Sequence, residues 1–130
     1  MPDRYIYSYL FLLLWIPGIL RAGDTAYVHA YGGPNIDHCK EMQATNDNGY
    51  VLIGSTSSYG NGNSDIYLVK VDSSGAYQWS KTYGGANIEW GYSIKQTYDN
   101  GYAIAGYTNS YGAGGYDVYL LKTDSLGGVL

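Results

Sequence analysis

Short apolar runs alternate with clusters of Gly, Asn, Asp and Ser along most of this chain. Such runs, rich in Tyr, Val, Ile and Thr and bounded by turn residues, are typical of β-strands. The pattern predicts strands over residues 41–46, 50–56, 65–71 and 77–83, followed by a second set further along the chain. No segment after the N-terminus has a helical period. We therefore predict an all-β fold.

The same pattern is an internal repeat with a period of 52 residues. Residues 31–78 align without a gap with residues 83–130, and 23 of the 48 aligned pairs are identical. A period near 50 residues is typical of one four-stranded antiparallel blade of a β-propeller. We therefore predict a β-propeller-like domain over residues 24–130, with two blades at about 27–78 and 79–130.

Two blades do not close a ring, because propellers use about four to eight of them. The chain is therefore expected to be a fragment of a larger ring, or one of several copies that assemble into a ring. Each repeat carries Asn-Gly between two strands, at residues 48–49 and 100–101, which predicts a two-residue hairpin turn. Residues 66–69 are apolar on both faces of their strand, as expected where neighbouring sheets cover both sides.

The N-terminus differs in kind from the repeats. Residues 10–16 form an apolar run that is preceded by Arg4 and followed by Pro17-Gly18. The run is too short to span a bilayer comfortably, and it fits the apolar region of a secretory signal peptide. We predict a signal peptide over residues 1–23, with an uncleaved N-terminal anchor as the alternative. The protein is then secreted or located at the cell surface.

Charge and cysteine content narrow the possible partners. The formal net charge is −4, which argues against nucleic acid and against an anionic membrane surface, since both require a basic footprint. The single cysteine, Cys39, cannot form a disulfide within the chain. It is either inert or pairs between chains.

The motifs W-x-K-T-Y-G-G, D-N-G-Y and D-x-Y-L-x-K-x-D-x-x-G follow one another in this chain. Together they resemble the repeats of secreted β-propeller proteins of bacteria and archaea. The matching positions are Trp79, Tyr83, Gly84, Gly85, Asp99, Gly101, Tyr102, Gly106, Asp117, Tyr119, Leu120, Lys122, Asp124 and Gly127. The resemblance covers nearly all of residues 24–130, with Asn48 and Asn100 where the family usually has Gly. It implies a secreted propeller module in a family that is mostly without assigned chemistry.

Carboxylates recur at matched places in the two repeats. The pairs are Asp47 and Asp99, Asp65 and Asp117, and Asp72 and Asp124. Gathered on one face they could bind Ca²⁺, but none lies in a D-x-D-x-D-G loop. An Asp that begins a turn usually accepts hydrogen bonds from its own backbone. We therefore predict no metal site and no cofactor.

Two further patterns of charged and titratable residues bear on possible chemistry. Lys70 with Asp72, and Lys122 with Asp124, stand two apart on one strand face and are expected to form ion pairs between blades. His38 has Asp37 close by in the sequence, but no Ser or Cys nucleophile accompanies it. We predict no catalytic residues.

Aromatic residues give the remaining functional signal. Most tyrosines recur at fixed repeat positions and are expected to pack. The aromatic residues that do not recur lie near Asp-, Asn- and Gly-rich loops, and aromatic rings with a polar tip are enriched at recognition surfaces. The candidates for a ligand-binding face are Trp90, Tyr92, Tyr98, Tyr107 and Tyr116.

These observations predict a non-catalytic, secreted or cell-surface module that binds a protein or a carbohydrate, or serves as a scaffold. Two alternatives stay open at this point. The chain could belong to a propeller hydrolase or lyase whose catalytic residues lie in further blades. It could also be a self-assembling structural surface protein, whose partners are copies of itself.

Overall fold

The computed structural model describes residues 26–130, which form two antiparallel sheets and contain no helix. The first sheet has the order β1-β2-β3-β4 and the second β5-β6-β7. The strands are β1 (Asp37–Ala44), β2 (Tyr50–Thr56), β3 (Asp65–Val71), β4 (Tyr77–Tyr83), β5 (Glu89–Gln96), β6 (Tyr102–Thr108) and β7 (Asp117–Thr123). The all-β prediction is confirmed. The predicted signal segment, residues 1–23, lies outside the described residues. Within them, no helix is long and apolar enough to cross a membrane.

For three of the four strands predicted in the first repeat, the predicted bounds agree with the observed ones. The predicted position of the first strand is wrong. The first strand was expected over residues 41–46, but β1 begins at Asp37 and ends at Ala44. It is mostly polar and exposed, so it has little apolar signal. A bulge also leaves Lys40 unpaired between Cys39 and Glu41, and such a bulge interrupts the alternation that marks a strand.

The expected two-residue hairpins are longer in the structure. Residues 45–49 connect β1 to β2, and the Thr45 N–H donates to the carbonyl of Gly49 at 2.9 Å. Asn48, at φ 64°, is the residue in the left-handed region, which Asn tolerates better than most side chains. Gly49 is needed for space instead, because a Cβ there would collide with the backbone carbonyl oxygen of Val71.

Each sheet has two faces, because successive side chains of a strand point to opposite sides. In the first sheet, Val51, Ile53, Ile66 and Leu68 lie on what we call the front face, and Leu52, Tyr67, Val69 and Val71 lie on the back face. In the second sheet, the aligned residues Ala103, Ala105, Val118 and Leu120 define the front face, and Ile104, Tyr119, Leu121 and Thr123 define the back face.

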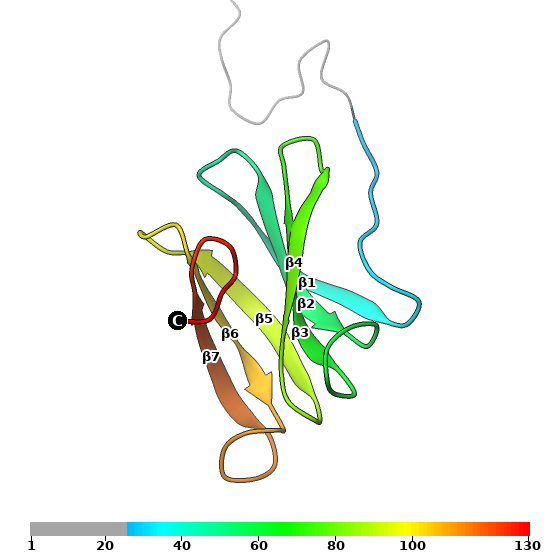
Figure 1. Ribbon diagram of the computed structural model, residues 1–130, viewed down its shortest axis with the longest axis vertical. Coiled ribbons are helices and arrows are strands. Elements are labelled where there is room, and N and C mark those ends of the chain that lie inside the picture. The colour runs from blue at the N-terminus through cyan, green and yellow to red at the C-terminus, as the bar shows by residue number, and fades with distance from the viewer. Residues whose placement is uncertain (1–25) are drawn as a thin grey trace, which may run out of the picture.

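The two sheets stack in the same orientation (Figure 1). The front face of the first sheet packs against the back face of the second in one buried cluster that includes Ile53, Leu68, Ile94 and Ile104. β5 makes the close approach: a Cβ at Gly91 would lie 2.8 Å from Cγ1 of Ile53. The two sheets do not close into a ring.

The back face of the first sheet is covered in part by the extended residues 26–33. Figure 1 shows this segment on the side of the first sheet away from the second. The Tyr31 hydroxyl donates to the carbonyl of Gly75 at 2.5 Å, and the Tyr83 hydroxyl donates to the carbonyl of Gly127 at 2.8 Å. Tyr31 aligns with Tyr83, and Gly75 aligns with Gly127, so the two hydrogen bonds are equivalent. The segment 26–33 therefore contacts the first sheet in the same way as β4 contacts the second sheet.

The predicted ladder ion pairs are wrong in their partners. Lys70 pairs with Asp47 at 2.9 Å, and Lys122 pairs with Asp99 at 2.8 Å, each within its own sheet. Asp72 instead accepts hydrogen bonds from the backbone of its own turn, including Ala76 N–H at 2.9 Å. The Lys70 side chain is buried and also donates to the carbonyl of Val71, so it joins the first hairpin turn to β3.

This ion pair predicts a pH dependence of stability. Hydrogen bonds from Thr45 and Lys70 lower the pKa of Asp47 to about 2. Because this folded pKa lies below the unfolded value of 3.8, ionised Asp47 stabilises the fold above about pH 4, and the effect is lost as the pH falls toward 2. We expect Asp47→Asn to destabilise the protein at pH 6 and to match the wild type near pH 2. Urea unfolding at both pH values measures the two differences. A difference that does not change with pH would contradict the assignment.

Candidate functional site

Four of the five candidate aromatic residues form one cluster at the end of the second sheet. The rings of Trp90 and Tyr107 stack at 5.8 Å between centroids with an interplanar angle of 24°. Tyr107 also lies 5.6 Å from Tyr92 and 4.9 Å from Tyr116, which meets it edge-on. We call Trp90, Tyr92, Tyr107 and Tyr116 the aromatic cluster.

Sheet geometry explains why these four residues meet. Trp90 of β5 and Tyr107 of β6 are directly opposite each other in the strand register, and such cross-strand pairs hold their rings in contact. Tyr92 is the unpaired residue of a β-bulge between Gly91 and Ser93. A bulge redirects the side chain of its extra residue. Tyr92 and Tyr116 are 45% and 60% exposed, so the cluster presents ring surface to solvent.

A cation from the other repeat completes this surface. The Nζ of Lys40 lies 5.4 Å from the ring centroid of Trp90 and 5.6 Å from that of Tyr92. At these distances the ammonium group is attracted to the ring faces. Lys40 is the bulge residue of β1 and aligns with Tyr92. Sequence reasoning missed Lys40, although its alignment with a candidate aromatic residue was a usable signal.

Tyr98 does not join the cluster. It is fully exposed in the turn between β5 and β6, whereas Trp90 lies at the other end of β5. His38, considered above for acid–base chemistry, lies 6.2 Å from Trp90 between ring centroids and therefore sits at the border of the cluster. The orientation of the Trp90 indole ring is held by a hydrogen bond, which its N–H donates to the hydroxyl of Ser64 at 3.1 Å.

The surroundings of Tyr107 keep its phenol group neutral. Burial, followed by the proximity of Tyr92 and Tyr116, raises the pKa of Tyr107. Tyr107 therefore stays neutral at physiological pH, and a neutral phenol both donates and accepts hydrogen bonds. The cluster thus offers ring faces, hydroxyl groups and the Lys40 ammonium group to a ligand.

The recurring aspartates serve the turns. Asp72 and Asp124 accept hydrogen bonds from backbone N–H groups of their own loops, at 2.8 Å from Ser74 and 2.7 Å from Gly128. Asp65 and Asp117 do the same for the preceding loops. Among residues 26–130, no three His, Cys, Asp or Glu side chains are grouped closely enough to hold a metal ion.

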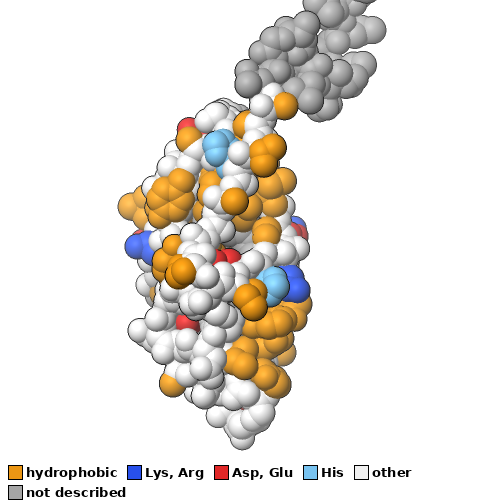
Figure 2. Space-filling model, turned by 90° about the vertical axis from the view of Figure 1, so that its right-hand side faces the viewer, with side chains coloured by type: hydrophobic (Ala, Val, Ile, Leu, Met, Phe, Trp, Pro, Cys, Tyr) orange, Lys and Arg blue, Asp and Glu red, His pale blue; other side chains and the backbone are white. Residues whose placement is uncertain are grey.

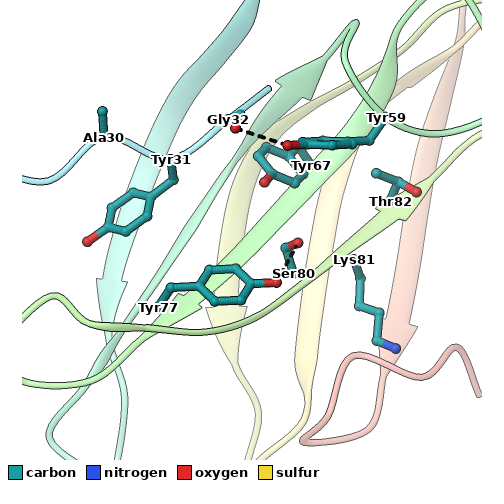
Figure 3. Close-up of a pocket in the computed structure, with 9 residues that line it drawn as sticks. All are labelled: Ala30, Tyr31, Gly32, Tyr59, Tyr67, Tyr77, Ser80, Lys81 and Thr82. Carbon is teal, nitrogen blue, oxygen red and sulfur yellow. Dashed lines mark hydrogen bonds between the residues drawn. The ribbon is translucent and has the colours of Figure 1, made fainter. Parts of the chain in front are cut away.

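A concave surface lies on the back face of the first sheet. This cleft, of about 530 Å³, is lined by Tyr31, Tyr59, Tyr67 and Tyr77 together with Ser80 and Thr82 of β4 (Figure 3). The Tyr59 hydroxyl donates to the carbonyl of Gly32 at 3.0 Å. Three of these tyrosines recur in the second repeat, so the sequence predicted them to pack. They line a cleft here because no further sheet covers this face.

Comparison with known proteins gives no independent guide to function. No protein-family model and no curated protein matches this chain.

Proposed function

We propose that this chain is part of a secreted or cell-surface β-propeller-like module that binds a glycan or a protein without catalysis. The aromatic cluster is its recognition surface. The single observation that carries the proposal is the joining of four non-recurring aromatic residues and Lys40, from two repeats, on one exposed surface. The blade assignment is supported by the repeat period and by the stacking of two equivalent sheets in one orientation.

The chemistry of the cluster favours a glycan as the first ligand to test. The exposed rings of Tyr92 and Tyr116 can pack against the apolar face of a sugar ring. Tyr hydroxyls and the Lys40 ammonium group can hydrogen-bond to sugar hydroxyl or carboxylate groups. Tyr and Trp are also frequent anchors of protein interfaces, so a protein ligand is screened in parallel.

We expect Tyr92→Ala to weaken binding by about tenfold or more, since one well-placed anchor is often worth more than 1 kcal/mol. The full chain is screened on a glycan array and in pull-downs from secreted protein fractions, and each hit is titrated by calorimetry. Tyr98→Ala is the matched control, because Tyr98 is exposed and lies outside the cluster. Equal losses from the two substitutions, or no ligand in either screen, would contradict the proposal.

A further inference from the structure

The front face of the second sheet is apolar and exposed. Val118 and Leu120 are 89% and 72% exposed, whereas the aligned Ile66 and Leu68 of the first sheet are fully buried. Ile66 and Leu68 are buried because the second sheet covers them. The second sheet thus carries an equivalent contact surface with nothing against it among the described residues.

The opposite end of the stack carries the other half of this interface. The back face of the first sheet borders an apolar cavity of about 300 Å³, lined by residues that include Cys39, Leu52 and Val69 beside the segment 26–33. Figure 2 shows this side of the molecule, with hydrophobic side chains gathered along it. The aligned back face of the second sheet is packed against the front face of the first. One chain therefore has both halves of the same interface.

Side-chain sizes at the two surfaces are complementary. Within the chain, the large Ile53 faces Gly91. In a junction of the same geometry between two copies, the small Ala105 would face the larger Cys39, because these residues align with Ile53 and Gly91. The size difference is reversed, so the pair still fills the space.

The rim of the interface follows the same rule. Within the chain, the large Trp90 contacts the small Ser64. Ser64 aligns with Tyr116, and Trp90 aligns with His38, so Tyr116 and His38 are the equivalent pair between copies. Here the larger residue, Tyr116, takes the place of the smaller residue of the pair within the chain. Two reversals of size at separate points favour a second copy over an unrelated partner.

Strand edges complete the match. Among residues 26–130, β7 has no neighbour beyond β6 apart from a bridge of Thr123 to Val129 and a hydrogen bond from Leu130 N–H to the Lys122 carbonyl. Residues 26–32 are extended but belong to no sheet, and residues 26–31 align with residues 78–83 of β4. Since β4 pairs with β3, the same geometry brings residues 26–32 of a second copy to the free edge of β7.

We propose that copies of this chain associate head to tail. The front face of the second sheet of one copy packs on the back face of the first sheet of the next, and residues 26–32 of that copy extend the sheet at β7. Such a heterologous contact closes into a ring or continues as a filament. Rings of about four to eight sheets correspond to about two to four copies.

The junction between copies is expected to be weaker than the junction within the chain. Within the chain, the carboxylate of Glu41 accepts from Ile94 N–H at 2.6 Å, and the side-chain oxygen of Gln43 accepts from Gln96 N–H at 2.9 Å. The residues aligned with Glu41 and Gln43 are Ser93 and Lys95. A lysine cannot accept a hydrogen bond, so at least one of these contacts is lost. We therefore expect assembly to reverse on dilution.

The test is the mass of the full chain, purified from a secreting host, by light scattering across a concentration series. The wild type is expected at a discrete multiple of the chain mass or as filaments, and to dissociate on dilution. Leu120→Lys is expected to be monomeric at all concentrations, because it places a charge in the centre of the contact. Leu120 is exposed in the single chain, so the substitution should leave the fold and its circular dichroism spectrum unchanged.

Leu126→Lys is the matched control, since Leu126 is 67% exposed in the turn after β7 and outside the front face. It is expected to assemble like the wild type. A wild type that stays monomeric at high concentration would overturn the proposal. So would a Leu120→Lys variant that assembles as the wild type does, since an occupant other than a second copy would then account for the exposed face.

Discussion

Replacing Ile53 with alanine is expected to lower the free energy of unfolding by about 3 to 4 kcal/mol. Ile53 is fully buried between the two sheets. Its Cγ1 lies 2.8 Å from the position that a Cβ would take at Gly91. Removal of a buried aliphatic side chain costs its transfer energy together with the cavity that it leaves, about 2 to 5 kcal/mol. Urea unfolding followed by tryptophan fluorescence measures this loss.

Because Ile53 contacts Gly91, substitutions at these two positions are expected to be coupled. Gly91→Ala alone is expected to destabilise the protein by about 1 to 3 kcal/mol, because it overpacks the space next to Ile53. In the Ile53→Ala background the same substitution is expected to cost less, since the added methyl group enters the cavity. A double-mutant cycle measures this coupling. Strictly additive losses would show that the two sheets do not meet at these residues.

The second large effect is expected at Glu89, a fully buried carboxylate. It accepts hydrogen bonds from Gly85 N–H and the Thr108 hydroxyl, both at 2.7 Å, and from Ser110 N–H at 3.1 Å. Glu89→Ala leaves Gly85 N–H and the Thr108 hydroxyl without this acceptor, whereas Ser110 N–H keeps its bond to the Thr108 Oγ1 at 3.0 Å. Each unsatisfied buried group costs about 1 to 3 kcal/mol. We expect a total loss of roughly 3 kcal/mol in urea unfolding. Glu89→Gln keeps the shape and one acceptor, and it should cost less.

The stability that Glu89 contributes is also expected to depend on pH. Burial raises the pKa of Glu89, but hydrogen bonds from Ser110, Thr108 and Gly85 outweigh burial and bring it below 4.5. The ionised carboxylate therefore stabilises the fold above about pH 4.5, and this contribution is lost as the pH falls through the folded pKa. The stability difference between wild type and Glu89→Gln should shrink on acidification. A difference that grows instead would mean that Glu89 is protonated in the fold.

Strand pattern and repeat period were sufficient for most of the fold. β2, β3 and β4 were predicted with their observed bounds because apolar residues and turn residues mark them clearly. β1 was not, because it is polar and carries a bulge at Lys40. The hairpin loops were predicted too short because Asn-Gly suits several turns. The choice among them depends on tertiary contacts such as that of Lys70 with Asp47.

The sequence predicted part of the candidate site. Comparison of the repeats separated non-recurring aromatic residues from recurring ones, and four of the five selected residues meet in space. Lys40 was missed because it lies in the other repeat and reaches the cluster only through the stacking of the sheets. The hydrogen-bonding role of Glu89 was also missed. Glu89 aligns with Asp37 but is not identical to it, so a search for identities passed over it.

Equivalent sheets stack front to back within the chain, and in the proposed assembly they stack in the same way between copies. An engineered crosslink tests the stacking between copies. Cys39 is exposed on the back face of the first sheet, and Ala105 lies on the front face of the second. Ala105→Cys would place a thiol opposite Cys39 of the next copy, as position 53 lies opposite position 91 within the chain. Although Cys39 as a residue is exposed, its thiol borders the cavity on the back face, and partial burial there raises the pKa of the thiol. Oxidation is therefore best done at mildly alkaline pH.

The measurement is mass spectrometry of the peptides linked after oxidation of the Ala105→Cys variant. Ala113→Cys, in the exposed loop before β7, serves as the control. We expect a disulfide between Cys39 and position 105 of different chains, and no more than background linkage from position 113. Equal crosslinking from positions 105 and 113, or none from position 105, would contradict front-to-back stacking between copies.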